Sequence, residues 1–464
     1  MPLKSKYYPA ILAGFFISVT VLTSRVFAEV NDIPALEPFV KGERVLILAP
    51  HPDDEDIGCG GVIQRALKAG AQVKVTYLTC GDNNIFSIIF YNKPFFLFRL
   101  LFLRNKDFVD LGHQRVHEAI NAMKILGLNE KDLIFLGYPD HGTNQMFIYS
   151  WNHEKPYRSS FSGHSNVPYQ ESMGYKKEFT ADNVIEDIKN VISSYKPDKI
   201  FVSSSSDVNG DHWAYYLYTM MSLADLNKEV PAPKIYPYLV HAPGWPLPRH
   251  YHPDLEIGPP LKFFGDVYPL INWRQLKLTD EEIDKKYKAM LAYDSQVRVS
   301  SFYLMSFVRQ NELFGDFPRI ILKKQSSSRA PVKQDKDIVF TSDMQWTGYA
   351  VIDDCLWVKI RKPREIKQRL NVFFGIFGYR DDVSFAKMPN ILVRIKYKRF
   401  SIFNATLGRY IDVDGASLDI NPESVIFKIP LSALGDPKGF LFGLETPAEY
   451  LPLGCTAFRM ISIE

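Results

Sequence analysis

The sequence lacks the features that mark several large classes of protein. Its four cysteines include no Cys-x-x-Cys pair, which disfavours a zinc site built from cysteine side chains. Its formal net charge is only +3 over 464 residues, so no nucleic-acid partner is indicated. The serine run at 203–206 has no Gly-x-Ser-x-Gly context, which excludes a nucleophilic serine of that type. We also find no internal repeats.

What is present indicates a folded chain with more than one domain. Hydrophobic residues make up 46% of the sequence and charged residues 23%, which is typical of globular rather than disordered proteins. The length suggests two or three domains. We expect a first domain at 42–315, a linker at 316–335 and an accessory β-rich domain at 336–464.

The first 28 residues have the pattern of an export signal. Lys4 and Lys6 give a positive start, residues 9–22 form a mostly apolar run, and 26–28 offers a signal peptidase site. We expect cleavage after Ala28 and an exported protein, either periplasmic or secreted. A retained N-terminal anchor is the alternative, although the apolar run is short for a span of about 20 residues.

The four cysteines are Cys59, Cys80, Cys355 and Cys455. Outside the cytoplasm cysteines can pair, and four of them allow three connectivities. Bridges Cys59–Cys80 and Cys355–Cys455 would each stay inside one domain. The sequence leaves the pairing open.

The first domain alternates between strand and helix patterns. Continuous apolar runs predict strands buried on both faces, and amphipathic stretches predict the helices between them. This alternation is typical of a mostly parallel, doubly wound α/β sheet. The expected strands are 45–49, 73–78, 133–136, 200–202 and 235–240, and the expected helices are 58–69, 115–126, 180–195 and 279–293.

After the linker the pattern changes to short runs rich in β-branched and aromatic residues, separated by Gly, Pro, Asn and Asp. This predicts an all-β, sandwich-like domain. Trp346, Trp357 and Tyr379 either fill its core or contact carbohydrate. The apolar segment 85–108 is either a lid or membrane-touching flap, or a helical insertion packed on the first domain; we favour the insertion.

A cluster of metal-binding side chains follows the first predicted strand. His51, Asp53 and Asp54 lie where a parallel sheet binds its ligands, beyond the carboxyl end of the strand. His51 and Asp54 can reach one cation, and zinc suits nitrogen and oxygen ligands together. A third ligand is needed, and His212 is the best candidate because it follows another strand. Asp211 beside it can orient an imidazole.

These residues carry a resemblance to a known family. The segment 51–55, His-Pro-Asp-Asp-Glu, resembles the signature of the PIG-L, or LmbE-like, deacetylases, and the order of segments extends the resemblance over about 42–315. It implies a Rossmann-like fold and zinc-dependent removal of the acetyl group from N-acetylglucosamine conjugates. By resemblance, His51, Asp54 and His212 hold the zinc and Asp53 is the general base.

The resemblance also implies a sugar site. Arg115 and Asp140 match family residues at the sugar, and the segment 238–241 resembles a late family segment near the active-site rim. The alternative for Arg115 is an ion pair with Glu118 on its own helix, and Asp140 could be a simple turn residue. We read His250 and His252 as loop residues near a rim rather than as a metal pair.

The second motif departs from the family pattern. Many members have a histidine that helps to stabilise the oxyanion where this chain has Asn209. Asn209 can still donate a hydrogen bond through its amide, but it cannot act as an acid. The identity of the general acid is therefore open.

Two other functions remain open at this stage. A zinc amidase acting on another small N-acyl substrate would have the same metal ligands. A non-catalytic glycan-binding protein with this fold is a second alternative, although neither the base nor a zinc ligand is missing.

Overall fold

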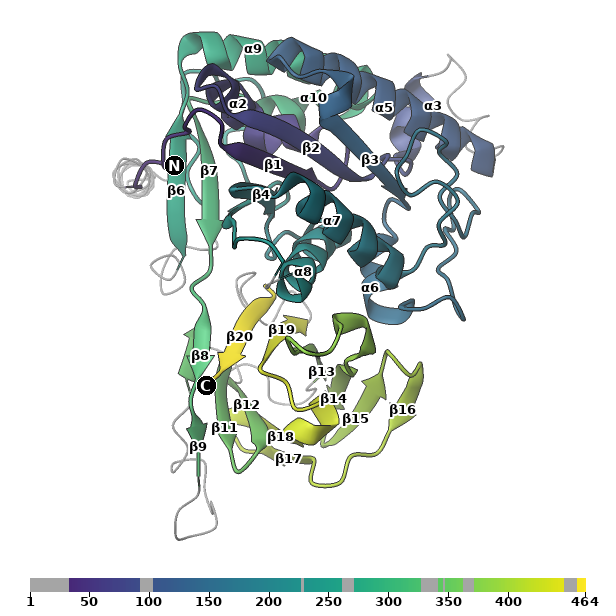
Figure 1. Ribbon diagram of the computed structural model, residues 1–464, viewed down its shortest axis with the longest axis vertical. Helices are drawn as coiled ribbons and strands as arrows, with labels where there is room; N and C mark the ends of the chain where they lie inside the picture. The colour runs from purple at the N-terminus through teal and green to yellow at the C-terminus, as the bar shows by residue number, and fades with distance from the viewer. Residues whose placement is uncertain are drawn as a thin grey trace, which may run out of the picture.

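The computed structural model describes residues 33–91, 103–226, 229–260, 271–326, 341–344, 347–361, 371–445 and 457–464. The first domain is built on a seven-stranded sheet, in the order β3-β2-β1-β4-β5-β7-β6 (Figure 1). Strands β1 to β5 are parallel, and β6 and β7 add an antiparallel edge. The strands are β1 (Arg44–Ala49), β2 (Gln72–Thr79), β3 (Leu133–Tyr138), β4 (Lys199–Ser203), β5 (Lys234–Tyr238), β6 (Asn272–Lys277) and β7 (Asn311–Asp316).

Helices cover both faces of this sheet, so the predicted doubly wound fold is confirmed. One face carries α2 (Asp54–Lys68), α3 (Ile85–Tyr91), α5 (Asn105–Leu126), α9 (Asp280–Met290) and α10 (Asp294–Leu304). The other face carries α6 (Thr143–Tyr149), α7 (Ala181–Tyr195) and α8 (Gly210–Asp225). Thr180 and Thr279 cap α7 and α9, as their sequences predict.

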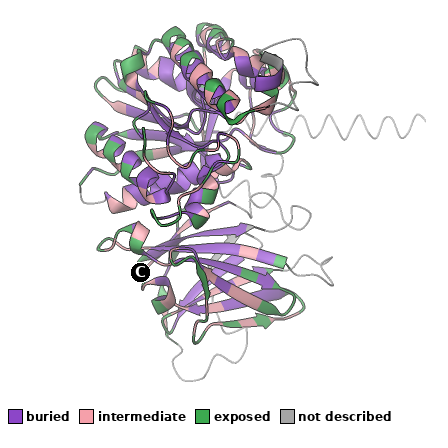
Figure 2. Ribbon diagram, turned by 90° about the vertical axis from the view of Figure 1, so that its right-hand side faces the viewer, coloured by how far each residue is buried: buried purple, intermediate pink, exposed green. Residues whose placement is uncertain are grey.

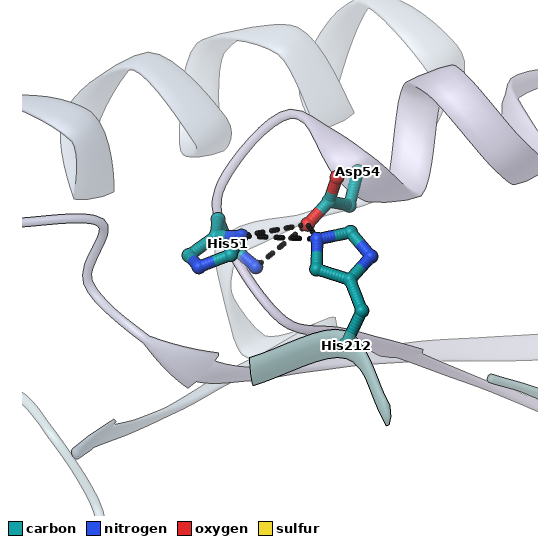
Figure 3. A group of neighbouring side chains, drawn as sticks. All are labelled: His51, Asp54 and His212. Atoms are coloured by element: carbon teal, nitrogen blue, oxygen red, sulfur yellow. Dashed lines mark hydrogen bonds and ion pairs between the residues drawn. The ribbon is translucent and has the colours of Figure 1, made fainter. Parts of the chain in front are cut away.

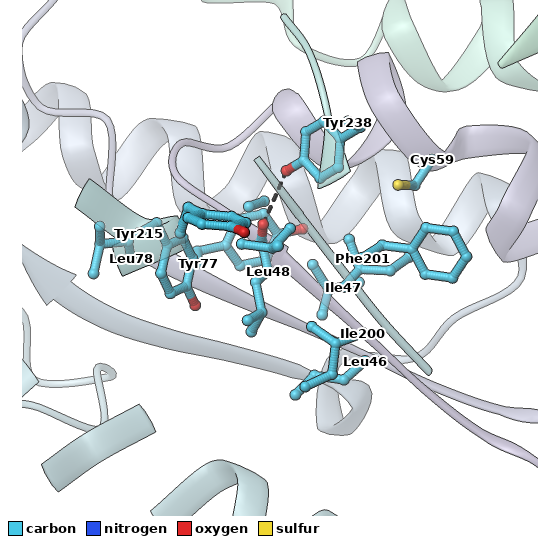
Figure 4. Packing of buried hydrophobic residues seen from close by; sticks show 14 of the residues in the cluster. Leu46, Ile47, Leu48, Cys59, Tyr77, Leu78, Ile200, Phe201, Tyr215 and Tyr238 are labelled. Atoms are coloured by element: carbon cyan, nitrogen blue, oxygen red, sulfur yellow. Dashed lines mark hydrogen bonds between the residues drawn. The ribbon is translucent and has the colours of Figure 1, made fainter. Parts of the chain in front are cut away.

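The core of this domain lies on the central strands. β1 and β4 are buried along their apolar residues, because helices cover both of their faces. Figure 4 shows Leu48 and Phe201 of these strands beside Tyr238, whose hydroxyl donates to the Leu48 carbonyl at 2.9 Å.

Helix α2 begins four residues earlier than we predicted, at Asp54. Position 58, inside that helix, is a glycine because a Cβ there would clash with the Tyr238 ring.

The second domain is a sandwich of two mainly antiparallel sheets, as predicted. Their inner faces form one apolar core, in which Phe374 and Phe427 contact each other from opposite sheets. The sheet nearer the first domain contains β16 (Arg409–Ile411), β15 (Arg399–Asn404), β14 (Asn390–Lys396), β13 (Asn371–Tyr379), β19 (Gly439–Glu445), β20 (Arg459–Ile463) and β8 (Ile320–Leu322). The outer sheet contains β10 (Thr341–Met344), β11 (Thr347–Ile352), β12 (Cys355–Arg361), β18 (Ser424–Pro430), β17 (Ser417–Ile420) and β9 (Lys324–Gln325).

The two domains share an apolar interface. Figure 2 shows buried strands in both domains and a chain path that continues from one to the other. Phe147 of α6 contacts Phe377 of β13, with ring centroids 5.1 Å apart, and Trp151 contacts Phe385 at 5.2 Å. Strands β8 and β9 fall within the range that we expected to be a linker. Both pair with strands of the sandwich.

The cysteine pairing that we considered is wrong for Cys59 and Cys80, which are free and buried. Cys59 lies within α2, whereas the Cys80 sulfur lies 3.8 Å from the Ser172 hydroxyl. Cys355 is also free. Cys455, Trp346 and the predicted signal segment lie outside the described residues.

The described ends of the segment 85–108 are helical. In α3, Ser87 donates to the Ser295 carbonyl at 2.8 Å, and Ile88 packs on Phe108 and Leu111 of α5. These contacts agree with an insertion packed on the domain, although residues 92–102 lie outside the described part. In the described ranges, no helix has both the length and the apolar character needed to cross a membrane.

Candidate metal centre

The candidate site lies at the point where the strand order of the parallel sheet reverses. The chain leaves β1 toward β2 and β3, whereas β4 and β5 extend the sheet on the other side of β1. Loops that follow two such neighbouring strands diverge and leave a crevice at the carboxyl edge. His51 and Asp54 follow β1, and His212 lies in the first turn of α8 after β4.

Three ligand atoms meet in this crevice (Figure 3). His51 Nδ1 lies 3.0 Å from Asp54 Oδ2, His212 Nε2 lies 3.2 Å from the same oxygen, and the two nitrogens are 3.3 Å apart. All three side chains are buried. Zinc bonds of 2.0–2.1 Å in a tetrahedron place neighbouring ligand atoms about 3.3 Å apart. The three donors therefore fit a zinc ion, with a fourth position free for water or substrate.

Carboxylates support the ring of His51 from behind. Its Nε2 atom lies 3.2 Å from Asp140 Oδ1 and 3.3 Å from Asp211 Oδ2. Asp211 is itself fixed, because it accepts hydrogen bonds from the Thr143 amide at 3.0 Å and from the Thr143 hydroxyl. Burial opposes the imidazolium, but Asp140, Asp211 and Asp54 together raise the pKa of His51 well above its usual value. Such partners fix the orientation of a ligating imidazole.

Asp207 supports His212, a role that we did not predict from the sequence. Its Oδ2 atom lies 3.2 Å from His212 Nδ1 and accepts from the backbone amides of Val240 and His241 at 3.1 and 2.8 Å. Its Oδ1 atom lies 3.2 Å from His241 Nδ1 and accepts a hydrogen bond from the backbone N–H of Asn209 at 2.9 Å. Burial disfavours the charged ring, but Asp207 and Asp54 raise the pKa of His212 to about 9.

His241 is a second side chain whose place at the site we did not predict, although its segment was expected near the rim. Its ring meets His212 edge to face at 4.6 Å and stacks on Tyr303 at 5.9 Å. Its side chain is 33% exposed, so it is reachable from solvent. A histidine just after a strand that neighbours β4 was the available signal.

Asp53 stands beside the three ligand residues in a strained backbone conformation, with a φ of 127°. Such strain in a residue other than glycine is typical of functional sites. Burial raises the pKa of Asp53 to about 8, although Arg115 and His51 pull it down. A cation at the neighbouring ligands would lower this pKa further.

Arg115 contacts Asp53 rather than its alternative partner Glu118. The guanidinium Nη2 donates to Asp53 Oδ2 at 3.1 Å and to the Pro52 carbonyl at 2.6 Å. Glu118 instead accepts from the Ser295 amide and hydroxyl. Arg115 is therefore placed to fix the carboxylate of Asp53.

The remaining predicted residues line the same pocket, which has a volume of about 290 Å³. Asp140 is more than a turn residue, because it contacts His51 and accepts from the Asn83 amide at 3.1 Å. Asn209 caps α8 through its side-chain oxygen, which leaves its amide nitrogen as a donor. His250 lies outside the residues that line this pocket. The lining includes His51, Asp53, Asp54, Arg115, Asp140, Asn209, His241 and Tyr303.

Residues 46–222 match the PIG-L family, described as GlcNAc-PI de-N-acetylase. A 1D-myo-inositol 2-acetamido-2-deoxy-alpha-D-glucopyranoside deacetylase of Kribbella flavida is 25% identical over 322 residues, which cover 60% of this chain and 91% of that protein. A putative glucosamine-6-phosphate deaminase-like protein of Bacteroides thetaiotaomicron is 24% identical over 201 residues, or 42% of this chain. The match spans only 29% of that relative's length.

Among solved structures, N,N′-diacetylchitobiose deacetylase from Pyrococcus horikoshii is 16% identical. The alignment covers 60% of this chain and 79% of that one, with a TM-score of 0.35.

Proposed function

We propose that the protein is a zinc-dependent hydrolase of N-acetylated amino sugars, because residues 46–222 match the PIG-L deacetylase family and contain the candidate metal ligands. The observation that carries the proposal is the triangle of His51 Nδ1, Asp54 Oδ2 and His212 Nε2, with Asp53 at its side. The amino-sugar substrate rests on the family description and on the Kribbella flavida relative.

The three ligand residues would hold zinc, which as a Lewis acid polarises an amide carbonyl and lowers the pKa of water. Asp53 would accept the proton of the attacking water as a general base. Arg115 engages its Oδ2 atom, so Oδ1 is the atom left to take the proton. The same carboxyl can then deliver that proton to the leaving nitrogen. Water and the acetamide are thereby converted into an amine and acetic acid, which at neutral pH are present as an ammonium group and acetate.

Two side chains are placed to hydrogen-bond the carbonyl oxygen as it gains charge. Asn209 would donate through its amide nitrogen, and His241 faces the same pocket from the end of β5. Preorganised donors at that oxygen contribute strongly to the hydrolysis of acyl groups.

We further propose that the protein acts outside the cytoplasm, on the basis of the sequence pattern in residues 1–28.

The test measures metal content and acetate release on the purified chain. Mass spectrometry should find about one zinc per chain, and a panel of N-acetylglucosamine conjugates should release acetate. Asp53→Asn should retain zinc and lose activity by about 10²–10⁴-fold, because it removes a general base. Asp284→Asn is the matched control, since Asp284 is exposed and pairs with Lys288 on the surface of α9.

The outcomes separate the alternatives. Zinc without release from any sugar, together with hydrolysis of another small N-acyl compound, would favour the amidase. A chain that neither holds zinc nor releases acetate would refute the enzyme and leave a glycan-binding protein.

A further inference from the structure

A second cavity lies between the two domains, next to the candidate active site. Its volume is about 450 Å³, within the range of ligand-binding pockets. The loop after β4 separates the two hollows: Asn209 lines the active-site pocket, whereas Val208 and Gly210 line the interdomain cavity. The two cavities therefore share this loop as a common wall.

A pair of glycines forms the floor of the cavity on the sandwich side. Gly375 of β13 and Gly443 of β19 are directly paired across the two strands. Phe377 lies over Gly375, where an added Cβ would be 2.6 Å from its ring, and Phe458 lies over Gly443. Glycine inside a strand marks a place where a ligand or another group comes close to the backbone. The two glycines therefore make room for the rings of Phe377 and Phe458, which line the cavity.

Aromatic and amide groups form the walls. Trp213, next to the metal-ligand candidate His212, stacks on Phe458 with ring centroids 5.0 Å apart. Phe373 adds a further ring, and Asn144 of α6 adds an amide. Among the described residues that line the cavity, Asp207 is the only charged one, and its carboxylate already contacts His212, His241 and backbone amides. The cavity is therefore built for an uncharged ligand.

We propose that this cavity binds a neutral sugar residue next to the N-acetylated residue that enters the active site. This inference rests on the proposed function, and it makes the substrate an oligosaccharide or glycan rather than a single sugar. The C–H faces of a pyranose ring are slightly positive and suit the negative faces of aromatic rings, while its hydroxyls suit amides. A phosphate or uronate would find no cation among the lining residues that the structure describes.

The aromatic residues that the sequence suggested for carbohydrate contact lie elsewhere. Trp357 lies on β12 of the outer sheet, beneath the Lys428 ammonium. Tyr379 lines a different cavity at the domain interface, of about 380 Å³, together with Arg319 and Asp381. The cavity beside the loop after β4 is distinguished by sharing that loop with the active-site pocket.

The test is calorimetric titration of the zinc-loaded full chain with N-acetylglucosamine oligomers of one to four units. Asp53→Asn serves as the parent so that the ligand is not consumed. We expect the trimer to bind about tenfold more tightly than the monomer, as ring stacking in a second subsite allows. Phe373→Ala and Asn144→Ala should each remove most of this advantage. Tyr410→Ala is the matched control, because Tyr410 is 71% exposed on β16.

Equal affinity for the monomer and trimer, or an advantage that survives both substitutions, would overturn the proposal. Tighter binding of an octyl N-acetylglucosaminide than of the trimer would also overturn it, because the cavity would then take an apolar aglycone. Acetate release measured in parallel with the unsubstituted chain keeps the two proposals apart. Release without any dependence on length refutes only the subsite, whereas length-dependent binding without release refutes only the hydrolase.

Discussion

Replacement of Asp207 by asparagine tests how much the metal centre depends on residues that do not bind the metal. The carboxylate of Asp207 contacts the Nδ1 atoms of both His212 and His241 and accepts from three backbone amides. Asparagine has nearly the same shape but no charge and only one acceptor oxygen. Its amide group must therefore face at least one of these donors.

The magnitude follows from the two roles of Asp207. A carboxylate behind a ligating histidine typically changes metal affinity by about 10–100-fold, equivalent to about 1.4–2.8 kcal/mol. The lost backbone contact leaves a buried donor without its acceptor, which costs about 1–3 kcal/mol of unfolding free energy. We therefore expect Asp207→Asn to weaken zinc binding by one to two orders of magnitude and to lower stability moderately.

Competition with a chromophoric chelator at pH 7.5 measures the zinc affinity, and urea denaturation of the zinc-free protein measures stability. Asp284→Asn is the control, since its side chain is 59% exposed and far from any metal-ligand candidate in sequence. A zinc affinity within twofold of the unsubstituted chain, in a folded variant, would refute the assignment of His212 as a ligand oriented by Asp207.

Three further predictions concern charge. The pKa of His212 is about 9 without zinc, so zinc must displace its proton at neutral pH. Apparent zinc affinity should then rise about tenfold per pH unit between pH 7 and 9 for each proton displaced, and a flat titration would contradict this. The raised pKa also stabilises the zinc-free fold below about pH 6.5, a contribution lost as the pH rises through about 9. Separately, Lys286→Met should lower the unfolding free energy by about 3–5 kcal/mol, because the buried carboxylate of Glu312 would lose its cationic partner. Lys288→Met, in an exposed pair, should change it by less than about 1 kcal/mol, and equal effects in urea denaturation would refute the argument.

The fold and the three ligand candidates could be predicted because their signals are local. Apolar runs such as 45–49 identify strands buried on both faces, and the carboxyl ends of those strands fix where ligands can lie. His51, Asp54 and His212 each follow such a strand. Their convergence required only that β1 and β4 be neighbours, which the alternation of strands and helices favours.

Asp207 and His241 could not be assigned in this way. The role of Asp207 depends on the loop after β4 meeting the end of β5, so that one carboxylate reaches two imidazoles. The partner of Arg115 could not be predicted either. The helical spacing suggested Glu118, whereas in the folded protein Arg115 contacts Asp53 and Glu118 accepts a hydrogen bond from Ser295. Contacts between segments far apart in the sequence leave no trace in a local pattern.

The helix start and the interdomain cavity show the same limit. We expected the helix to start at Gly58, yet it begins at Asp54, and a neighbouring tyrosine ring makes glycine necessary at position 58 inside α2. Gly375 and Gly443 are unremarkable in their own strands, and only the tertiary structure shows that they make room for the rings of Phe377 and Phe458. Both cases depend on which surface lies opposite the glycine.

The pairing of β20 with β8 has a consequence for biosynthesis. β8 is made directly after the first domain, but its partner strand, residues 459–463, is made more than a hundred residues later. Until those residues leave the ribosome, β8 and β19 present open hydrogen-bonding edges, which are prone to pair with other chains. A premature stop codon just upstream of Arg459 would leave these edges permanently open. We therefore expect such a truncation to produce an aggregating protein even though every residue of the candidate active site has been translated.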